Sequence, residues 1–362
     1  MIAHLDSAPA ASLPPSVLSK PGVAAVRQTI CGKPVHTVPS RILNQKSGFG
    51  HKLLCDGATF TAGTACVYRC QFCFVEPMFC RNVVVRSLLK REGAEFGDVV
   101  IRRQDPVNKI RAELTRRDGS PKFSDPADNR VIFGSPLVDI APTVELADET
   151  AAVCLQILEL THWQIRLLSK SPLITRIAQA IPEKHKQRVI FGLSTGTLDD
   201  RVAAAIERGA PLVSKRIAAL HWLQDHGYRT FAMLCPSLPQ RDYAAFSKKL
   251  CDAVRVDRCE HVWTEVLNAR GLALTRTCDA LDQAGFKAEA AALLEVSRNK
   301  KKWEAYARAT FAAHARNVAP EKLRFLQYVS KASRDWWAER AGEGAILLGR
   351  SATAVRKQEV QS

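Results

Sequence analysis

The feature that most constrains the fold of this chain is the alternation, between residues 57 and 271, of short β-branched runs with helical stretches. Such alternation is typical of a parallel α/β sheet. The expected strands cover residues 58–65, 98–102, 130–133, 164–168, 188–193, 229–234 and 261–266. The expected helices cover residues 106–116, 143–160, 173–181, 198–207, 213–226 and 243–254. The sequence therefore predicts a (β/α) barrel, complete or partial.

Both ends of the chain depart from this pattern. Residues 1–46 are rich in Ala, Pro and Ser without a sustained period, which predicts a mobile N-terminal tail. Beyond Gly271 no further strand is expected, and three helices are predicted over residues 274–294, 300–316 and 320–340. The predicted organisation is a tail (1–46), a barrel (47–275) and a basic helical C-terminal region (276–362).

Length and composition narrow the class of protein. With 362 residues, 46% hydrophobic and 24% charged, the chain can form one large core with an appendage. The 11 cysteines are too sparse for a disulfide scaffold, and their odd number argues against complete pairing. Residues 1–22 lack the features of a signal peptide, and no apolar run reaches the roughly 18–20 residues that span a bilayer. We expect a cytoplasmic protein with no membrane partner.

The charge suggests a polyanionic partner. A formal net charge of +16 and a pI near 9.5 favour nucleic acid first and an anionic membrane surface second. A basic surface that binds neither is a nearly equal alternative.

Three cysteines follow the first expected strand at a C-x-x-x-C-x-x-C spacing, namely Cys66, Cys70 and Cys73. A compact loop can bring these thiolates to one 4Fe-4S cluster. Such a cluster usually takes four cysteines, so three ligands leave one iron open for an exogenous ligand.

Two other interpretations of the loop are weaker. A structural zinc site needs four ligands, typically in two close pairs, and Cys251 and Cys259 are too far apart to form the second pair. Buried structural cysteines are also common. The tight spacing beside the aromatic residues Tyr68, Phe72 and Phe74 argues against that alternative.

The loop resembles that of the radical S-adenosylmethionine (SAM) superfamily. There the three cysteines follow the first strand of a partial, TIM-like (β/α)6 barrel, and an aromatic residue such as Phe72 precedes the third cysteine. Other segments resemble the spore photoproduct lyase-like branch: residues 99–102 with 113–114, 168–171, 192–195 with 198–200, and 207–211 with Arg216. The resemblance covers about residues 52–271. It implies a radical SAM barrel with a C-terminal helical extension and lyase-like or transferase chemistry.

The resemblance also implies cofactors and a mechanism of initiation. A reduced 4Fe-4S cluster would cleave SAM to methionine and a 5′-deoxyadenosyl radical, with electrons from a donor such as flavodoxin or ferredoxin. SAM would lie at the carboxyl ends of the strands. The implied cofactor-binding residues are Gly134, Ser135, Pro136, Ser169, Lys170, Ser194 and Arg216. Plainer roles stay open, because serines often satisfy turn backbone and the basic residues could be surface charges.

One departure from that branch concerns the hydrogen donor. Spore photoproduct lyases use a cysteine after the loop and before the middle of the barrel, but this chain has none between Arg81 and Val153. Cys80 is too near the loop, and Cys154 lies in an apolar helix and is expected in the core. Cys235 is the candidate catalytic residue if it faces the site. The resemblance therefore predicts the initiation chemistry and not the substrate.

The C-terminal region bears on the substrate. Residues 298–337 mix lysines and arginines with aromatic residues, as nucleic-acid surfaces do, although aromatics at helical spacing usually pack a core. The leading hypothesis is a radical SAM enzyme that acts on nucleic acid or a nucleotide-like substrate. The alternatives are a radical SAM enzyme acting on a peptide or small metabolite, and a non-catalytic iron-sulfur nucleic-acid-binding protein.

Overall fold

The computed structural model describes residues 28–79 and 82–349. Its main element is a sheet in which six parallel strands lie side by side in chain order. These are β4 (Ala58–Phe60), β7 (Val131–Gly134), β8 (Gln164–Ser169), β9 (Val189–Ser194), β10 (Arg229–Ser237) and β11 (Val262–Val266). The predicted partial (β/α)6 arrangement is confirmed.

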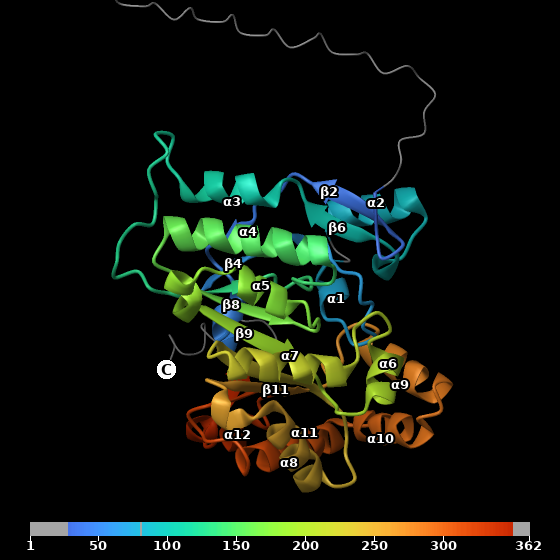
Figure 1. Cartoon of the computed structure of the whole chain (residues 1–362). Helices are drawn as coiled ribbons and strands as arrows, with labels where there is room; N and C mark the ends of the chain where they lie inside the picture. The colour runs from blue at the N-terminus through green and yellow to red at the C-terminus, as the bar shows by residue number, and fades with distance from the viewer. Residues whose placement is uncertain (1–27, 80–81, 350–362) are drawn as a thin grey trace, which may run out of the picture.

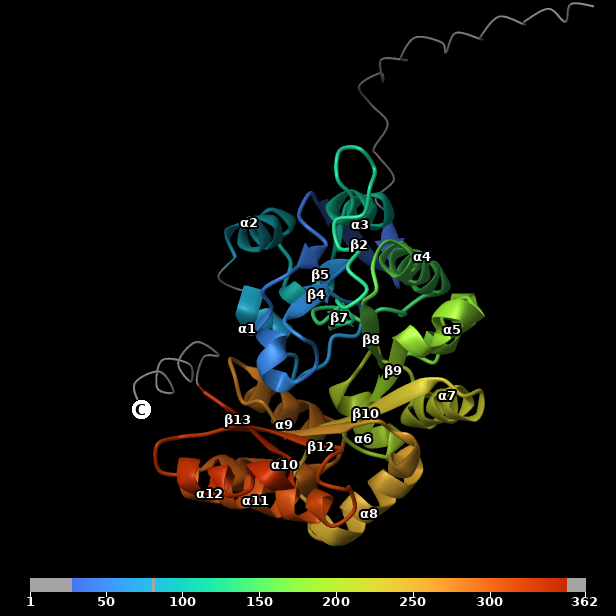
Figure 2. The ribbon, with the colours of Figure 1, turned by 90° about the vertical axis from the view of Figure 1, so that its left-hand side faces the viewer.

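Helices cover the outer face of this sheet (Figures 1 and 2). They are α3 (Pro106–Leu114), α4 (Val144–Leu160), α5 (Ile174–Ala180), α7 (Val213–Asp225) and α8 (Tyr243–Val254). Helix α6 (Asp200–Ile206) follows β9 but packs against α9 (Ala273–Gln283). The boundaries of α3 to α8 fall within two or three residues of the prediction, because side chains such as Thr143, Asp199 and Asp242 cap the helix N-termini. Cys154 of α4 is fully buried in the core, as expected.

The inner face of the sheet is closed at one end. Large side chains fill the interior, among them Phe133, Phe231 and Trp263. Arg166 of β8 donates hydrogen bonds to the carbonyl oxygens of Leu53 (3.2 Å) and Leu54 (2.7 Å). The open end therefore lies at the carboxyl ends of the parallel strands.

The C-terminal prediction is partly wrong. Helices α9 (Ala273–Gln283), α10 (Lys287–Ser297) and α11 (Lys300–Ala315) agree with it, but residues 320–340 do not form one helix. Instead β12 (Leu323–Tyr328) pairs in parallel with β11, and β13 (Ala345–Leu348) pairs in parallel with β12, with the short α12 (Arg334–Ala338) between them. The free edge of β11 offers backbone hydrogen bonds that overrode the helical pattern.

The N-terminal prediction also changes. Residues 1–27 lie outside the described residues, but residues 28–46 contain β1 (Thr29–Ile30), β2 (Lys33–Val38) and β3 (Leu43–Asn44). The expected strand at 58–65 divides into β4 and β5 (Gly63–Ala65). The expected strand at 98–102 is β6 (Val100–Arg103), which belongs to a second small sheet of order β1-β2-β6-β5. Strands β1, β2, β5 and β6 therefore lie outside the barrel, whereas β3 and β4 belong to the main sheet.

The main sheet does not close on itself within the described residues. Its edges are β3, which pairs antiparallel with β4, and β13. The 3-10 helix η1 (Gly48–Lys52) contacts both β4 and β13 and occupies the gap between them. The remaining elements are α1 (Val75–Phe79), α2 (Val83–Glu92), η2 (Phe96–Asp98), η3 (Glu183–Arg188), η4 (Val256–Arg258) and η5 (Ala341–Glu343). Of the helices described, none has the length and apolar character needed to cross a bilayer.

Candidate functional site

A cavity of about 220 Å³ lies at the carboxyl ends of the parallel strands. The cysteine loop forms one wall, and residues at the ends of β7 to β11 form the others. Ligands of parallel α/β barrels bind at this end, because loops from several strands converge there. The fold thus brings the three-cysteine loop to the end of the barrel where a ligand is expected to bind.

The cysteine loop begins directly after β5 and ends at α1. Cys66, Cys70 and Cys73 all line the cavity, and each is partly buried. The loop is held against the connection between α6 and α7, since Gln71 N donates to Ile206 O at 2.8 Å and Gly209 N donates to Tyr68 O at 3.0 Å.

Gly209 allows this close approach. A Cβ at this position would lie 3.0 Å from the carbonyl oxygen of Val67 and 3.1 Å from Tyr68 Cα. A larger residue would push the loop away from the α6–α7 connection.

Burial is the main influence on the three thiols. Burial, with a smaller contribution from the neighbouring Cys73, raises the pKa of Cys66 to about 11. The pKa of Cys70 is raised by burial and by Glu207, whereas Lys170 opposes the shift. Burial also raises the pKa of Cys73. Without a bound cation the thiols are therefore protonated at neutral pH.

Backbone donors face two of the sulfurs. The N–H groups of Tyr68 and Asp139 interact with Cys66, and those of Val75 and Glu76 interact with Cys73. Each interaction lowers the pKa of its thiol and stabilises the thiolate. Within residues 28–79 and 82–349 no group of three or more His, Cys, Asp or Glu side chains is arranged to hold a metal ion.

Most of the predicted cofactor-binding residues are brought together. The cavity is lined by Ser135, Pro136, Ser169, Lys170 and Ser194. Ser135 has a left-handed backbone (φ 47°), and its N–H donates to Phe60 O at 2.6 Å, so this residue joins the end of β7 to β4.

Gly134 does not line the cavity. It lies in β7, where a Cβ would be 2.5 Å from the Leu167 side chain and 2.8 Å from the Phe60 ring. Packing within the sheet therefore accounts for this glycine.

Arg216 does not line the cavity either, and its side chain is 1% exposed. It pairs with Glu207 at 2.5 Å and donates to the carbonyl oxygens of Ser194 (3.0 Å) and Pro211 (2.8 Å). Glu207 in turn pairs with Lys170 at 2.9 Å. Arg216 thus holds Glu207 and the end of β9 in place, and Glu207 in turn holds Lys170 at the cavity.

Lys170 places a positive charge beside the cysteine loop. Its Nζ donates to Ser194 Oγ at 2.8 Å and lies 5.5 Å from the centre of the Phe72 ring. Burial lowers the pKa of Lys170, but the Glu207 carboxylate raises it and the net shift is upward. The ammonium group therefore stays charged.

Asp139 is a site residue that the sequence analysis missed. It accepts hydrogen bonds from Ser169 Oγ and Lys170 N, both at 2.7 Å, and burial raises its pKa. No motif marks it, because it lies in an irregular segment after β7.

Cys235 faces the cavity, the condition under which it was a candidate. Burial and the Glu265 carboxylate raise its pKa well above the ordinary value, so Cys235 is a neutral thiol. Glu265, also missed, lies at the end of β11; a polar residue at the carboxyl end of an expected strand was the available signal.

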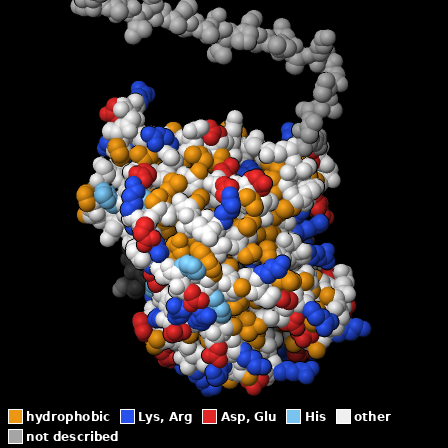
Figure 3. All heavy atoms as spheres, in the orientation of Figure 1, with side chains coloured by type: hydrophobic (Ala, Val, Ile, Leu, Met, Phe, Trp, Pro, Cys, Tyr) orange, Lys and Arg blue, Asp and Glu red, His pale blue; other side chains and the backbone are white. Residues whose placement is uncertain are grey.

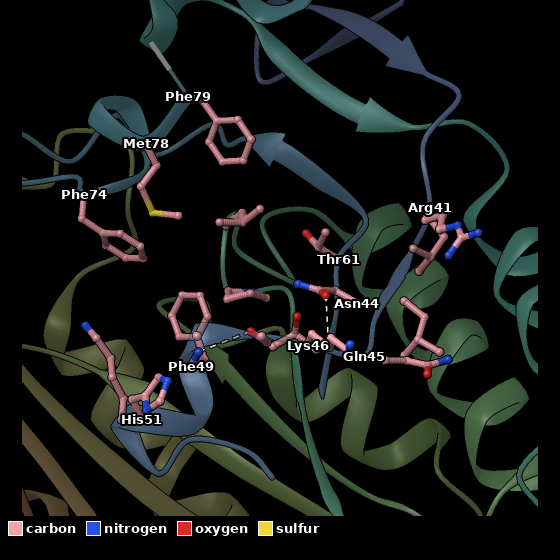
Figure 4. Close-up of a pocket in the computed structure, with 18 of the residues that line it drawn as sticks. Arg41, Asn44, Gln45, Lys46, Phe49, His51, Thr61, Phe74, Met78 and Phe79 are labelled. Atoms are coloured by element: carbon pink, nitrogen blue, oxygen red, sulfur yellow. Dashed lines mark hydrogen bonds between the residues drawn. The ribbon is translucent and has the colours of Figure 1, made fainter. Parts of the chain in front are cut away.

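A larger cleft of about 1500 Å³ adjoins the cavity. The two spaces share six lining residues: Phe49, Lys52, Phe74, Pro136, Leu137 and Asn268. In Figure 4, Phe49, Phe74, Met78 and Phe79 gather on one side of the cleft, with Arg41 on the other.

The lining of this cleft is strongly basic. It includes Arg41, Lys46, His51, Lys52, Arg103, Lys109, Lys122 and Arg270. The acidic lining residue is Glu113, whose carboxylate already accepts from the N–H groups of Ile42 (3.0 Å) and Leu43 (2.7 Å). The cleft therefore favours anionic ligands.

The C-terminal aromatics are mainly structural. Tyr306, Phe325 and Trp337 are at most 2% exposed, and Trp303 and Trp336 pack against the same core. The packing alternative is confirmed for these five residues. On the face shown in Figure 3, Lys and Arg are interspersed with Asp and Glu rather than gathered in one basic patch.

A separate hollow of about 190 Å³ is also lined by all three loop cysteines. Arg69, Arg208 and Arg276 contribute to its lining. The cysteine loop is thus a wall shared by two spaces.

Comparisons with protein-family models and with curated proteins gave no match. Among solved structures, a spore photoproduct lyase variant with bound SAM and dinucleoside spore photoproduct is 14% identical, with a TM-score of 0.42 over 64% of this chain and 61% of that one. Another lyase variant is 12% identical, with a TM-score of 0.45 over 63% and 61%. SuiB of Streptococcus suis bound to its precursor peptide is 13% identical, with a TM-score of 0.38 over 64% and 44%. This chain therefore spans less than two thirds of each, and function is inferred from the site.

Proposed function

We propose that this chain is a radical SAM enzyme that holds a 4Fe-4S cluster on Cys66, Cys70 and Cys73. The observation that carries this proposal is the position of the three thiols on one wall of a cavity at the carboxyl ends of the parallel strands. When bound, such a cluster supplies one electron to SAM at its open iron, which yields methionine and a 5′-deoxyadenosyl radical.

The residues present fit such a cluster. The three thiols line one cavity and each is partly buried, which is the arrangement that the three cysteine ligands of a single cluster require. The N–H groups facing Cys66 and Cys73 are the kind of donors that tune cluster sulfurs.

The chain's own side chains would position SAM. We assign Lys170 to the SAM carboxylate, because its ammonium group is charged, lines the cavity and is fixed by Glu207 and Ser194. Ser135, Pro136 and Ser169 would border the methionyl and ribose groups, and Arg216 would hold Glu207 in place.

Cys235 is the proposed hydrogen donor. Its raised pKa keeps the proton on sulfur, and a thiol rather than a thiolate carries the hydrogen that a carbon radical can take. Transfer would form a C–H bond on the substrate and leave a thiyl radical on Cys235.

The proposed substrate is nucleic acid or a nucleotide-like molecule. The basic cleft that opens into the cavity supports this choice, since phosphate contacts by Lys and Arg supply most of the binding energy for nucleic acids. Its aromatic lining residues Phe49, Phe74 and Tyr328 are suited to stacking on bases.

An acidic one-electron carrier such as flavodoxin or ferredoxin would approach at the second hollow. The cysteines line it together with Arg208, whose charge would attract an acidic partner, whereas Arg69 and Arg276 are paired with Asp98 and Glu76.

Anaerobic reconstitution with iron, sulfide, SAM and a reductant tests the proposal. We expect visible cluster absorbance and 5′-deoxyadenosine, with more product when the right DNA, RNA or extract is added. Cys70→Ala should abolish both signals, whereas Cys31→Ala, at an exposed cysteine that does not line the cavity, should not. A fully loaded cluster without 5′-deoxyadenosine would favour the non-catalytic alternative, and stimulation by peptides or metabolites alone would exclude nucleic acid.

A further inference from the structure

Lys52 lies where the cleft meets the cavity. It is the last residue of η1, the segment that occupies the gap between β4 and β13. Of the described residues that line both spaces, Lys52 is the only charged one. A substrate that enters the cavity from the cleft must pass its ammonium group.

The backbone of Lys52 is firmly held. Its carbonyl oxygen accepts a hydrogen bond from Nε1 of the buried Trp263 at 2.8 Å, and Leu53 N donates to Gly50 O at 2.9 Å to end the 3-10 helix. The origin of the side chain is thereby fixed relative to the barrel.

The ammonium group has a carboxylate partner. Its Nζ forms an ion pair with Glu265 Oε2 at 3.7 Å, interacts with the Tyr328 side chain, and lies 5.8 Å from the ring centres of both Phe74 and Tyr328. Burial lowers the pKa of Lys52, but the Glu265 carboxylate raises it and the net shift is upward, so the group stays charged. Because an ammonium group has three N–H donors, Lys52 can keep its contact with Glu265 and still bind a phosphate from the cleft side.

Charges inside the cavity oppose deeper entry of an anion. Asp139 and Glu265 line it, and Lys170, already paired with Glu207, is the residue assigned to the SAM carboxylate, so these charges disfavour a second anionic group. An anionic group would therefore stop at Lys52, and an uncharged part of the same molecule would reach the cysteine loop.

We propose that Lys52 binds a phosphate of the substrate at this passage and so selects which part of the substrate enters the cavity. This inference rests on the proposed nucleic-acid or nucleotide-like substrate. It makes Lys52 a specificity-determining residue, distinct from the residues that would bind SAM.

Equilibrium binding of a labelled single-stranded oligonucleotide to the cluster-loaded protein, without reductant, tests the inference. We expect Lys52→Met to weaken binding about tenfold or more, because hydrogen bonds to charged groups contribute about 1.5–3 kcal/mol. The slope of log affinity against log salt should fall by about 0.7, the value for one phosphate on a single strand. Lys52→Arg should restore both values to near those of the wild type.

Two controls separate a phosphate contact from a structural effect. An oligonucleotide with an uncharged methylphosphonate backbone should bind wild type and Lys52→Met equally. Lys301→Met, on the exposed face of α11, should bind as the wild type does. Equal affinity of wild type and Lys52→Met for the charged strand would overturn the inference, as would a failure of wild type to prefer the charged strand. Either result leaves the 5′-deoxyadenosine assay, and thus the initiation chemistry, unaffected.

Discussion

Burial and a few fixed charges set the chemistry of single side chains at the candidate site. The loop thiols and Cys235 are kept protonated by burial, whereas Lys170 and Lys52 keep their charge because carboxylates lie beside them. Each thiolate that a cluster needs must therefore be stabilised by the iron itself, since a bound metal deprotonates a coordinating thiol. Metal binding and the release of thiol protons should be linked.

The raised thiol pKa values predict a pH dependence of stability. Cys66 titrates near pH 11 in the folded apoprotein and near 9.0 when unfolded, so its contribution is complete below about pH 9 and is lost as the pH rises to about 11. The loss should be roughly 2–3 kcal/mol for this group. Denaturant unfolding of the apoprotein at several pH values measures it. Cys66→Ala should reduce the loss, and an identical pH profile in this variant would contradict the assignment.

At the scale of elements, connections between strands and helices position the site. The α6–α7 connection holds the cysteine loop, and the end of β9 lies against the end of β10. The alternation of strand and helix predicted β7 to β11 closely, because each of these strands is a short run buried by its neighbours. The same pattern did not predict β12, because the spacing of Phe325 and Tyr328 also suits a helix. Pairing with the free edge of β11 is what makes this segment a strand.

Gly196 provides a test of this packing. A Cβ at this position would lie 2.0 Å from the carbonyl oxygen of Pro236, next to Cys235. Gly196→Ala should therefore destabilise the protein by about 1–3 kcal/mol, because backbone must move to relieve the contact.

Thermal unfolding of Gly196→Ala measures the change. Gly342→Ala is the matched control, since a Cβ there meets nothing within 4 Å and should leave the melting temperature unchanged. Equal melting temperatures of the two variants would show that β9 and β10 are not packed as described.

At the scale of the whole molecule, the position of charge matters more than its sum. The net charge of +16 suggested a polyanion, and the sequence placed the contact in the C-terminal region. The structure instead gathers basic residues in the cleft beside the cavity, from segments near residues 41–52, 103–122 and 270. In the C-terminal region, Arg308 pairs with Glu304 at 2.9 Å and lies over Trp336.

Charge reversal distinguishes binding of nucleic acid in the cleft from binding on the C-terminal region. The double variant Arg41→Glu and Lys109→Glu, in the cleft, should lower the affinity for single-stranded nucleic acid by at least tenfold and reduce its salt dependence. Lys300→Glu with Lys301→Glu makes the same change in net charge on α11 and should have a much smaller effect. Binding measured at two salt concentrations tests this prediction. A larger loss of affinity in the α11 variant would show that the C-terminal region, and not the cleft, binds nucleic acid.

The sequence alone determined the cysteine loop and the strands β7 to β11, because these depend on local spacing and on periodicity. That the loop follows β5, outside the barrel, was decided by the tertiary structure. Only the tertiary structure decided that Gly134 and Arg216 lie outside the cavity lining and that Asp139 and Glu265 lie within it. The same holds for Lys52 and Glu265, which are far apart in sequence and meet because η1 occupies the gap beside β13 and β11 ends at the cavity. Such contacts depend on how distant strands close around one space, and no local pattern encodes that geometry.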